Sequence, residues 1–327
     1  MKSSTLALMT SLSHKAKQYL LTALKVFILA ITFGYIYVKL TSGDGVDLDG
    51  FKATLASKDN IEMGEVLFFV FLTIINWTFE ILKWQTLVLA VQNISFTTAL
   101  KQSLASLTVS LATPNRIGEY GAKAYFFVPS KRKQVLLLNF VGNMTQMIIT
   151  TLFGIIGLCV LVFTYNISFS WMNIILLGAG VIVLSVLVYI FKEKELLLKG
   201  LSISKVVRYI KGLSTKIKLR VLVFSLIRYA TFCFLFYRLM LFFGAGITFE
   251  IAIFMIMAMY LLVSVIPTLF IFDVVIRSGV AVWLFSLAGT AEIIVLCTVF
   301  AMWILNFVVP SIVGSFYVIS HKSAVKC

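Results

Sequence analysis

The chain has 327 residues, of which 61% are hydrophobic and 13% are charged. Soluble domains carry about 45–50% apolar and about 25% charged residues, so this composition excludes an ordinary soluble domain. It predicts an all-α polytopic membrane protein, because helices satisfy their own backbone hydrogen bonds in lipid. The net charge of +15 at pH 7 accompanies no nucleic-acid motif, and the basic residues flank apolar segments. We therefore expect the membrane bilayer, and no nucleic acid, as the partner.

An apolar segment that ends near Leu40 follows four lysines. No polar cleavage region comes after it, which favours an uncleaved first helix over a removed signal peptide. Residues 44–65 carry six carboxylates against two lysines, and this acidic bias places them outside. A second helix is predicted from about Val66 to Val91. Within it, Glu80 and Lys83 share one face and can pair, either as a structural ion pair or as the lining of a cavity.

The next segment places Arg116, Glu119 and Lys123 among apolar residues, in the sequence TPNRIGEYGAKAYFF from Thr113 to Phe127. Charges at membrane depth are usually retained only where they pair, face water or bind a ligand. If residues 96–129 crossed the membrane fully, the basic residues after them and the later basic loop would both lie outside, against the positive-inside rule. We therefore predict a re-entrant hairpin over 96–129, broken near its proline.

Residue types at this break suit an anion. If Thr113 caps the second half-helix, Arg116 lies in its first turn, where a cation opposes the helix dipole unless an anion is bound. Free backbone amides and Arg116 together suit a phosphate. Glu119 and Lys123 are four residues apart and can pair, or Glu119 can carry a proton. A structural, salt-bridged turn is the alternative interpretation.

A stretch of 58 residues, from Gln134 to Phe191, carries no charge and accommodates two crossings of about 20 residues each. The following segment, 192–220, holds nine Lys or Arg and two Glu, which predicts a cytoplasmic location. Apolar residues recur at helical spacing between Lys205 and Lys218. We expect a basic amphipathic helix there, lying on anionic lipid, with a solvated connector as the alternative.

A further helix is predicted from Val221 to Phe243. It carries Arg228 and Arg238, which either line a cavity or extend toward the two ends of the helix. A second hairpin, broken at a proline, is predicted over 250–288. In it Asp273 precedes Arg277 by four residues, the favourable order for an ion pair.

A last span from Ile293 to Ser320 leaves both termini in the cytoplasm. The predicted fold is one transmembrane domain over residues 1–327, with about six spanning helices and two Pro-broken re-entrant hairpins in an inverted repeat. Such paired breaks indicate a midplane substrate site in transporters. Alternatively, residues 251–272 cross fully and the number of spans rises to eight. The predicted substrate-binding residues are Thr113, Asn115, Arg116, Glu119, Lys123, Asp273 and Arg277, and the candidate cavity-lining residues are Glu80, Lys83, Arg228 and Arg238.

At Thr113–Phe127 the sequence resembles the flippase-like integral membrane family related to the lysylphosphatidylglycerol synthase transmembrane region. The match is a Pro-x-Arg-x-Gly-Glu core, with Asn115 where glycine is frequent. In the second half only Pro267, Arg277 and Gly279 match, and Asp273 stands in for the family's acidic residue. The resemblance implies a translocase of a lipid or of a lipid-linked sugar, and the expected partner is an anionic phospholipid or a polyprenyl-phosphate-linked lipid. The expected location is a bacterial cytoplasmic (inner) membrane.

Two other functions remain open. A scaffold or accessory subunit of an envelope-lipid pathway would need the same apolar helices without transport. A membrane-embedded enzyme is less favoured, because the two histidines, His14 and His321, lie near the termini and no nucleophile or phosphate-loop motif is present. Catalysis would then depend on Glu119 and Asp273. We expect no metal or other cofactor.

Overall fold

The computed structural model describes residues 62–111, 113, 116–166, 202–266 and 270–320. The predicted first helix, the second helix of the charge-free stretch, Asn115, Pro267 and both termini lie outside these residues. Every regular element within them is helical, in this order: α4 (Met63–Val88), α5 (Phe96–Leu111), α6 (Gly118–Tyr125), η2 (Pro129–Lys131), α7 (Arg132–Thr164), α9 (Ile203–Gly212), α10 (Thr215–Phe242), α11 (Phe249–Val265), α12 (Phe270–Ser286), α13 (Glu292–Trp303), η3 (Ile304–Val308) and α14 (Val309–Ser320).

Four helical segments among the described residues are long and apolar enough to span a membrane: Met63–Val88, Pro129–Thr164, Thr215–Phe242 and Glu292–Ser320. Their outward faces carry exposed large apolar side chains, among them Leu67, Leu152 and Phe316. Exposed apolar side chains on such helices are typical of contact with lipid or with another protein. The chain is therefore a helical integral membrane protein, as its composition predicts.

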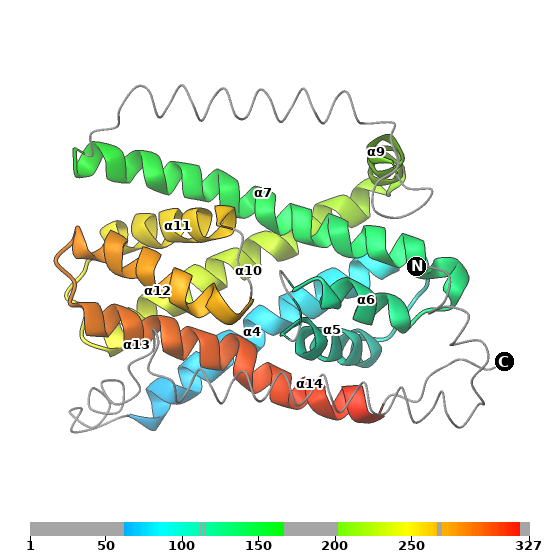
Figure 1. Ribbon diagram of the computed structural model, residues 1–327, viewed down its shortest axis with the longest axis horizontal. Helices are drawn as coiled ribbons and strands as arrows, with labels where there is room; N and C mark the ends of the chain where they lie inside the picture. Colours follow the sequence, from blue (N-terminus) through cyan, green and yellow to red (C-terminus); the bar gives the residue numbers. More distant parts are fainter. Residues whose placement is uncertain (1–61, 112, 114–115, 167–201, 267–269, 321–327) are drawn as a thin grey trace, which may run out of the picture.

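The remaining helices are shorter than these four segments. The longest of them, α11 and α12, have 17 residues each, which corresponds to about 25 Å against a hydrocarbon thickness of about 30 Å. Helix α5 packs against α6, and α11 packs against α12. In Figure 1 the two pairs occupy opposite halves of the bundle, and the break of each pair faces the middle. Breaks therefore occur at both predicted places, before Gly118 and after Val265.

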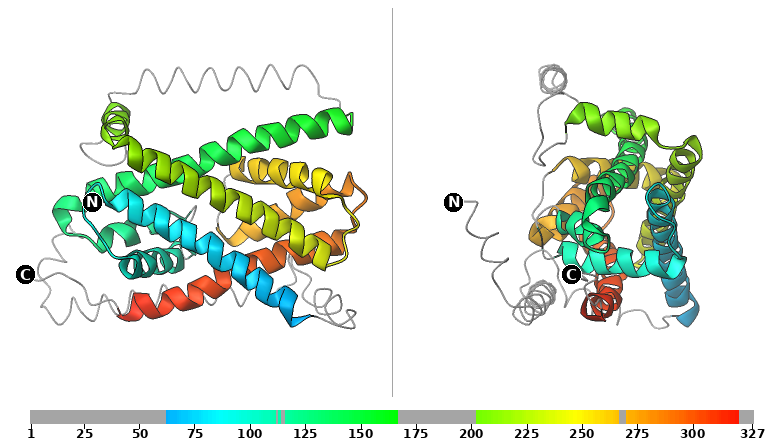
Figure 2. Two further views of the ribbon diagram at one scale, coloured as in Figure 1. Left: turned by 180° about the vertical axis from the view of Figure 1, so that it is seen from behind. Right: turned by 90° about the vertical axis from the view of Figure 1, so that its right-hand side faces the viewer.

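Two apolar cores hold these halves together. One is formed by α10, α11, α12 and α13, with Phe236, Met255 and Phe285 fully buried. The other joins α4, α6 and α7 around Trp84 and Leu138. Helices α4, α7 and α10 run through both halves (Figures 1 and 2), so the middle of the bundle lies between the two cores.

Two predicted boundaries need correction. The helix expected to begin at Val221 begins at Thr215, and the basic helix expected over Lys205–Lys218 ends at Gly212. The physical reason is the backbone after Gly212, because Leu213 and Ser214 have extended conformations with ψ of 140° and 137°. The basic residues after this break therefore belong to α10. Helix α9 lies across the end of the bundle, as the right-hand view of Figure 2 shows.

The last span is also interrupted, which the sequence analysis did not predict. Residues Ile304–Val308 form a π-helical turn between α13 and α14. Pro310 explains it, since proline lacks an N–H and its ring would collide with the carbonyl four residues earlier in an α-helix. Within this turn Asn306 donates to the Met302 carbonyl at 3.1 Å and accepts from Asn76 of α4 at 2.9 Å. The widened turn is thus fixed to a neighbouring helix.

Helix α14 approaches α5 most closely at Gly314. A Cβ at this position would collide with the Leu104 carbonyl and the Thr108 hydroxyl. Small residues permit such contacts between membrane helices. By contrast, a Cβ placed on Gly279 of α12 would have no heavy atom of the described residues within 4 Å, apart from its chain neighbours and the backbone of its own helix.

We expect Gly314→Ala to lower the thermal unfolding midpoint, because overpacking costs about 1–3 kcal/mol and exceeds the gain in helix propensity. Gly279→Ala is the matched control and should leave the midpoint unchanged or raise it. Both variants would be measured by tryptophan fluorescence in the same detergent. Equal midpoints for the two variants would contradict the close contact between α14 and α5.

Candidate functional site

Charged side chains from separate segments meet in the middle of the bundle. Glu80 Oε2 of α4 lies 2.6 Å from Lys83 Nζ, as its spacing predicts, and 2.8 Å from Nη1 of Arg228 of α10. The Glu80 and Lys83 side chains are almost fully buried, and Arg228 is largely buried. Arg228 therefore pairs inside the protein and does not extend to the end of its helix.

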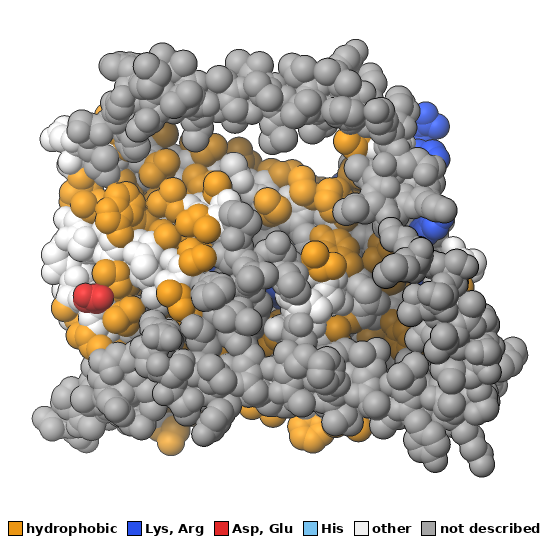
Figure 3. All heavy atoms as spheres, viewed as in Figure 1, with side chains coloured by type: hydrophobic (Ala, Val, Ile, Leu, Met, Phe, Trp, Pro, Cys, Tyr) orange, Lys and Arg blue, Asp and Glu red, His pale blue; other side chains and the backbone are white. Residues whose placement is uncertain are grey.

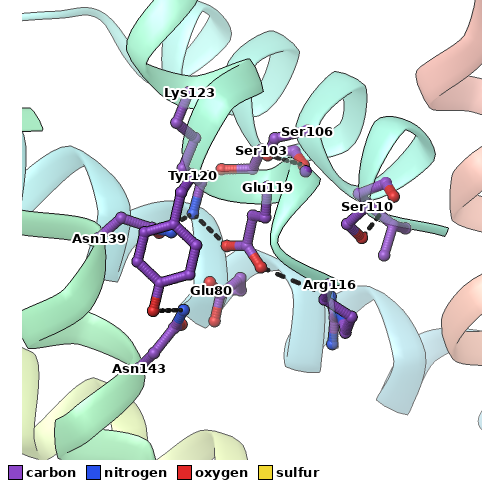
Figure 4. A network of polar contacts seen from close by, with 12 residues as sticks. Glu80, Ser103, Ser106, Ser110, Arg116, Glu119, Tyr120, Lys123, Asn139 and Asn143 are labelled. Carbon is purple, nitrogen blue, oxygen red and sulfur yellow. Dashed lines mark hydrogen bonds and ion pairs between the residues drawn. The ribbon is translucent and has the colours of Figure 1, made fainter. Parts of the chain in front are cut away.

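Glu119 of α6 is the second buried carboxylate of this region. Its Oε1 lies 2.7 Å from Lys123 Nζ, and its Oε2 lies 3.8 Å from Arg116 Nη2. Figure 4 shows the Glu119 side chain between these two cations, with Glu80 close by. The expected pair between Glu119 and Lys123 is present, whereas the contact with Arg116 is long for a charge-assisted hydrogen bond.

Lys123 is enclosed on several sides. Besides Glu119, its ammonium group donates to Asn139 Oδ1 of α7 at 2.8 Å and lies 4.4 Å from the centre of the Trp84 ring of α4. Trp84 in turn donates from Nε1 to Gln102 of α5 at 2.8 Å. These contacts link α6 directly to α7 and α4, and through Trp84 to α5, and they surround the ammonium group with three partners. They favour a role in which Lys123 positions Glu119.

Arg116 lies in the turn before α6, which corrects its predicted place in the first helical turn. Its φ of 56° is left-handed, and this conformation is incompatible with a right-handed helix. Thr113 is not the N-cap of α6 as expected, because Ile117 occupies that position. Its hydroxyl instead stabilises the turn, since it accepts from the Gly118 N–H at 2.8 Å and donates to the Ser110 carbonyl at 3.0 Å. A Cβ on Gly118 would lie 2.7 Å from that hydroxyl oxygen, so glycine is required there.

A cavity of about 310 Å³ connects the two halves of the protein. Arginines from three places line it: Arg116 before α6, Arg228 of α10 and Arg277 of α12. A smaller chamber of about 40 Å³ shares Arg116 and Arg228 and is also lined by Glu80, Glu119 and Lys123. The structure therefore brings six of the eleven predicted residues to these two spaces, namely Glu80, Arg116, Glu119, Lys123, Arg228 and Arg277.

Two predicted residues need separate mention. Arg238 lines neither space, and its guanidinium lies 5.4 Å from the centre of the Phe68 ring, outside this cluster. Asp273 belongs to α12, but its side chain is not among those described. The predicted pairing of Asp273 with Arg277 therefore stays a prediction.

Several buried polar atoms around the cavity have no hydrogen-bond partner among the described residues. They include Nε of Arg116 and of Arg228, Oε1 of Gln146 and the hydroxyl of Tyr260. Each such atom costs about 1–3 kcal/mol unless solvent or a ligand satisfies it. Donors predominate in this set, because guanidinium groups donate only and the hydroxyl can donate. The space is suited to a ligand rich in acceptor oxygens.

The sequence analysis missed the uncharged members of the site. Helix α7 contributes Asn139 to the Lys123 contact, Asn143 and Gln146 to the two spaces, and Thr150 to the larger one. These positions recur at intervals of three and four residues, the signature of one helical face. This stripe of polar residues on one helical face, within the stretch that carries no charge, was the sequence signal that could have identified them. Asn143 also donates to the Tyr120 hydroxyl at 3.1 Å, which joins α7 to α6.

Comparison with protein-family models gives no match for this chain, and comparison with curated proteins gives none either. The resemblance at Thr113–Phe127 therefore stays a hypothesis. In the part of the chain that the structure describes, no three His, Cys, Asp or Glu side chains are grouped so that they could hold a metal ion.

We expect Lys123→Met to destabilise the protein by about 3–5 kcal/mol, because it leaves the Glu119 carboxylate buried without its nearest cation. Adding Glu119→Gln should restore much of this loss. Chemical unfolding in detergent measures both effects. Lys101→Met is the control, since Lys101 is exposed on α5. A Lys123→Met protein as stable as the Lys101→Met protein would show that the buried pair does not position α6.

Proposed function

We propose that this protein is a flippase-like translocase that moves a lipid with an anionic headgroup through the cavity in the middle of the bundle. The observation that carries the proposal is the convergence of Arg116, Arg228 and Arg277 on one space of about 310 Å³. Guanidinium groups bind phosphate oxygens through paired hydrogen bonds. An anionic phospholipid or a polyprenyl-phosphate-linked lipid supplies such a group.

The arrangement of the helix pairs supports translocation. The breaks of α5–α6 and of α11–α12 face the middle from opposite halves (Figure 1), and both contribute to the cavity through Arg116, Val263 and Ser264. We infer that each pair is a re-entrant hairpin and that the two belong to an inverted repeat with about six spans. In transporters with this plan, the two halves move against each other around a fixed site.

Charge at the two ends supports an orientation. Basic residues gather where α7 and α10 begin and along α9, whereas Glu62, Glu65, Glu250 and Glu292 lie where α4, α11 and α13 begin, at the other end. Figure 3 shows basic side chains on one edge and an acidic one on the opposite edge. By the positive-inside rule the basic end faces the cytoplasm, in a bacterial inner membrane with both termini inside.

Single cysteines test this topology in a background without the four native cysteines. A cysteine at Ser130, in η2, should react with a membrane-impermeant maleimide only from the cytoplasmic side. A cysteine at Gly289, between α12 and α13, should react only from outside. Labelling of position 130 from outside would overturn the inverted repeat and the orientation together.

Arg116→Gln tests the function itself. Arg116 is the most exposed cation of the cluster, at 38% of its side chain, and its contact with Glu119 is 3.8 Å long. Its removal should therefore leave the unfolding midpoint nearly unchanged. A lost hydrogen bond to a charged group is worth about 1.5–3 kcal/mol, so transport should fall at least about tenfold. The measurement is the scrambling of fluorescent phosphatidylglycerol and of a fluorescent polyprenyl phosphate in proteoliposomes.

The control for this experiment is Arg238→Gln, which removes the same charge from a position outside the cavity. It should transport both lipids at the wild-type rate. Wild-type scrambling by a stably folded Arg116→Gln protein would contradict the proposal and favour a scaffold. An unfolded Arg116→Gln protein that Glu119→Gln restores would instead identify a structural ion pair.

A further inference from the structure

A second basic depression lies at the end of the bundle, apart from the central cavity. It is an open groove of about 620 Å³ between Ala90 after α4, the helix α9 and the first turn of α10. Lys205, Arg208 and Tyr209 line it from α9. It shares no lining residue with either central space. Whatever binds here does not contact the arginines of the transport site.

The surroundings of the groove indicate the headgroup region of a membrane. Helix α9 lies across the end of the bundle (Figure 2, right) and exposes Lys205 and Arg208 beside Val207, which is 44% exposed. Leu219, shortly after the start of α10, is 59% exposed. Exposed apolar side chains next to exposed cations are typical of a helix in the boundary between headgroups and acyl chains.

The lining has both polar and apolar parts. Arg208 offers a guanidinium fork for a phosphate, and the exposed Ser214 offers a hydroxyl that caps no backbone N–H of α10. Leu213 and Ile217 form an apolar side of the same groove. Tyr209 is amphipathic, as is usual for aromatic residues at membrane interfaces.

We propose that this groove binds the headgroup of an anionic phospholipid from the leaflet at the basic end of the bundle. Arg208 and Lys205 contact the phosphate, while Leu213 and Ile217 face the glycerol and the upper acyl chains. A lipid is favoured over free phosphate because the groove has this apolar side and exposed apolar neighbours. The site holds a lipid in place and is independent of the translocation that the central cavity performs.

The experiment uses the full-length protein in detergent and counts bound lipids by native mass spectrometry. Dioleoyl phosphatidylglycerol is titrated against dioleoyl phosphatidylcholine. The double variant Lys205→Gln/Arg208→Gln should bind phosphatidylglycerol at this site about 30-fold more weakly, the equivalent of about 2 kcal/mol for two charges. Arg208→Gln alone should weaken phosphatidylglycerol binding about fivefold. This single variant replaces the double variant in the experiment if the double variant folds poorly. Higher salt should weaken the wild-type binding.

The matched control is Lys211→Gln/Lys216→Gln. It removes two charges from α9 and α10, the helices that border the groove, at positions that do not line it. It should retain the lipid. An equal loss of phosphatidylglycerol binding in this control would overturn the site, because binding would then depend on the overall surface charge and not on the groove. Equal retention of phosphatidylcholine, or displacement of the lipid by millimolar inorganic phosphate, would also overturn it. Arg116→Gln should leave this lipid bound, so failure of the central site and failure of the groove are separate results.

Discussion

The cost of placing charge in an apolar medium is the constraint on which this structure depends. In the described residues, the middle of the bundle holds two carboxylates, and each is contacted by one lysine and one arginine. Removing such groups from water costs several kcal/mol per ion unless the partners are well placed. Glu80 pairs with Arg228 of α10, which is distant in the sequence, and Glu119 pairs with Lys123 of its own helix. The Glu80–Arg228 pair joins α4 to α10, while Lys123 joins α6 to α7 and α4 through Asn139 and Trp84.

The same constraint explains why the helices break where they do. A break releases backbone N–H and C=O groups, which lipid does not satisfy, so it must lie inside the protein or beside water. The turn before α6 meets this condition through Thr113, which bonds to Gly118 and to Ser110. Arg116 can adopt its left-handed backbone only in such a supported turn. Backbone strain and a charged side chain thus occur together at Arg116, next to the cavity.

Local features of the fold could be predicted from the sequence, and features that depend on packing could not. An apolar run indicated α4, and prolines indicated the two breaks. Spacings of three and four residues indicated the Glu80–Lys83 and Glu119–Lys123 pairs. The contact between Arg228 and Glu80 joins distant segments, and no periodicity encodes it. The break after Gly212 was not predicted, because the apolar pattern continues into α10 although the backbone turns at Leu213. The π-helical turn at Ile304–Val308 was not predicted, because Pro310 was not recognised as a cause of helix distortion.

The two carboxylates differ in a way that bears on function. Glu80 contacts both of its cations at 2.6–2.8 Å, whereas Glu119 contacts Lys123 at 2.7 Å and Arg116 only at 3.8 Å. If the cluster served stability alone, a shorter distance between Arg116 and Glu119 would stabilise it most, because the attraction between buried opposite charges increases as their distance decreases. Arg116 instead faces the larger cavity, where Arg228 and Arg277 also lie. Arg228 is already paired with Glu80 at 2.8 Å, whereas the contact of Arg116 with Glu119 is 3.8 Å long, so Arg116 is the better placed of the two to meet an anion in this space. The geometry thus favours a ligand with negative charge over a purely structural cluster.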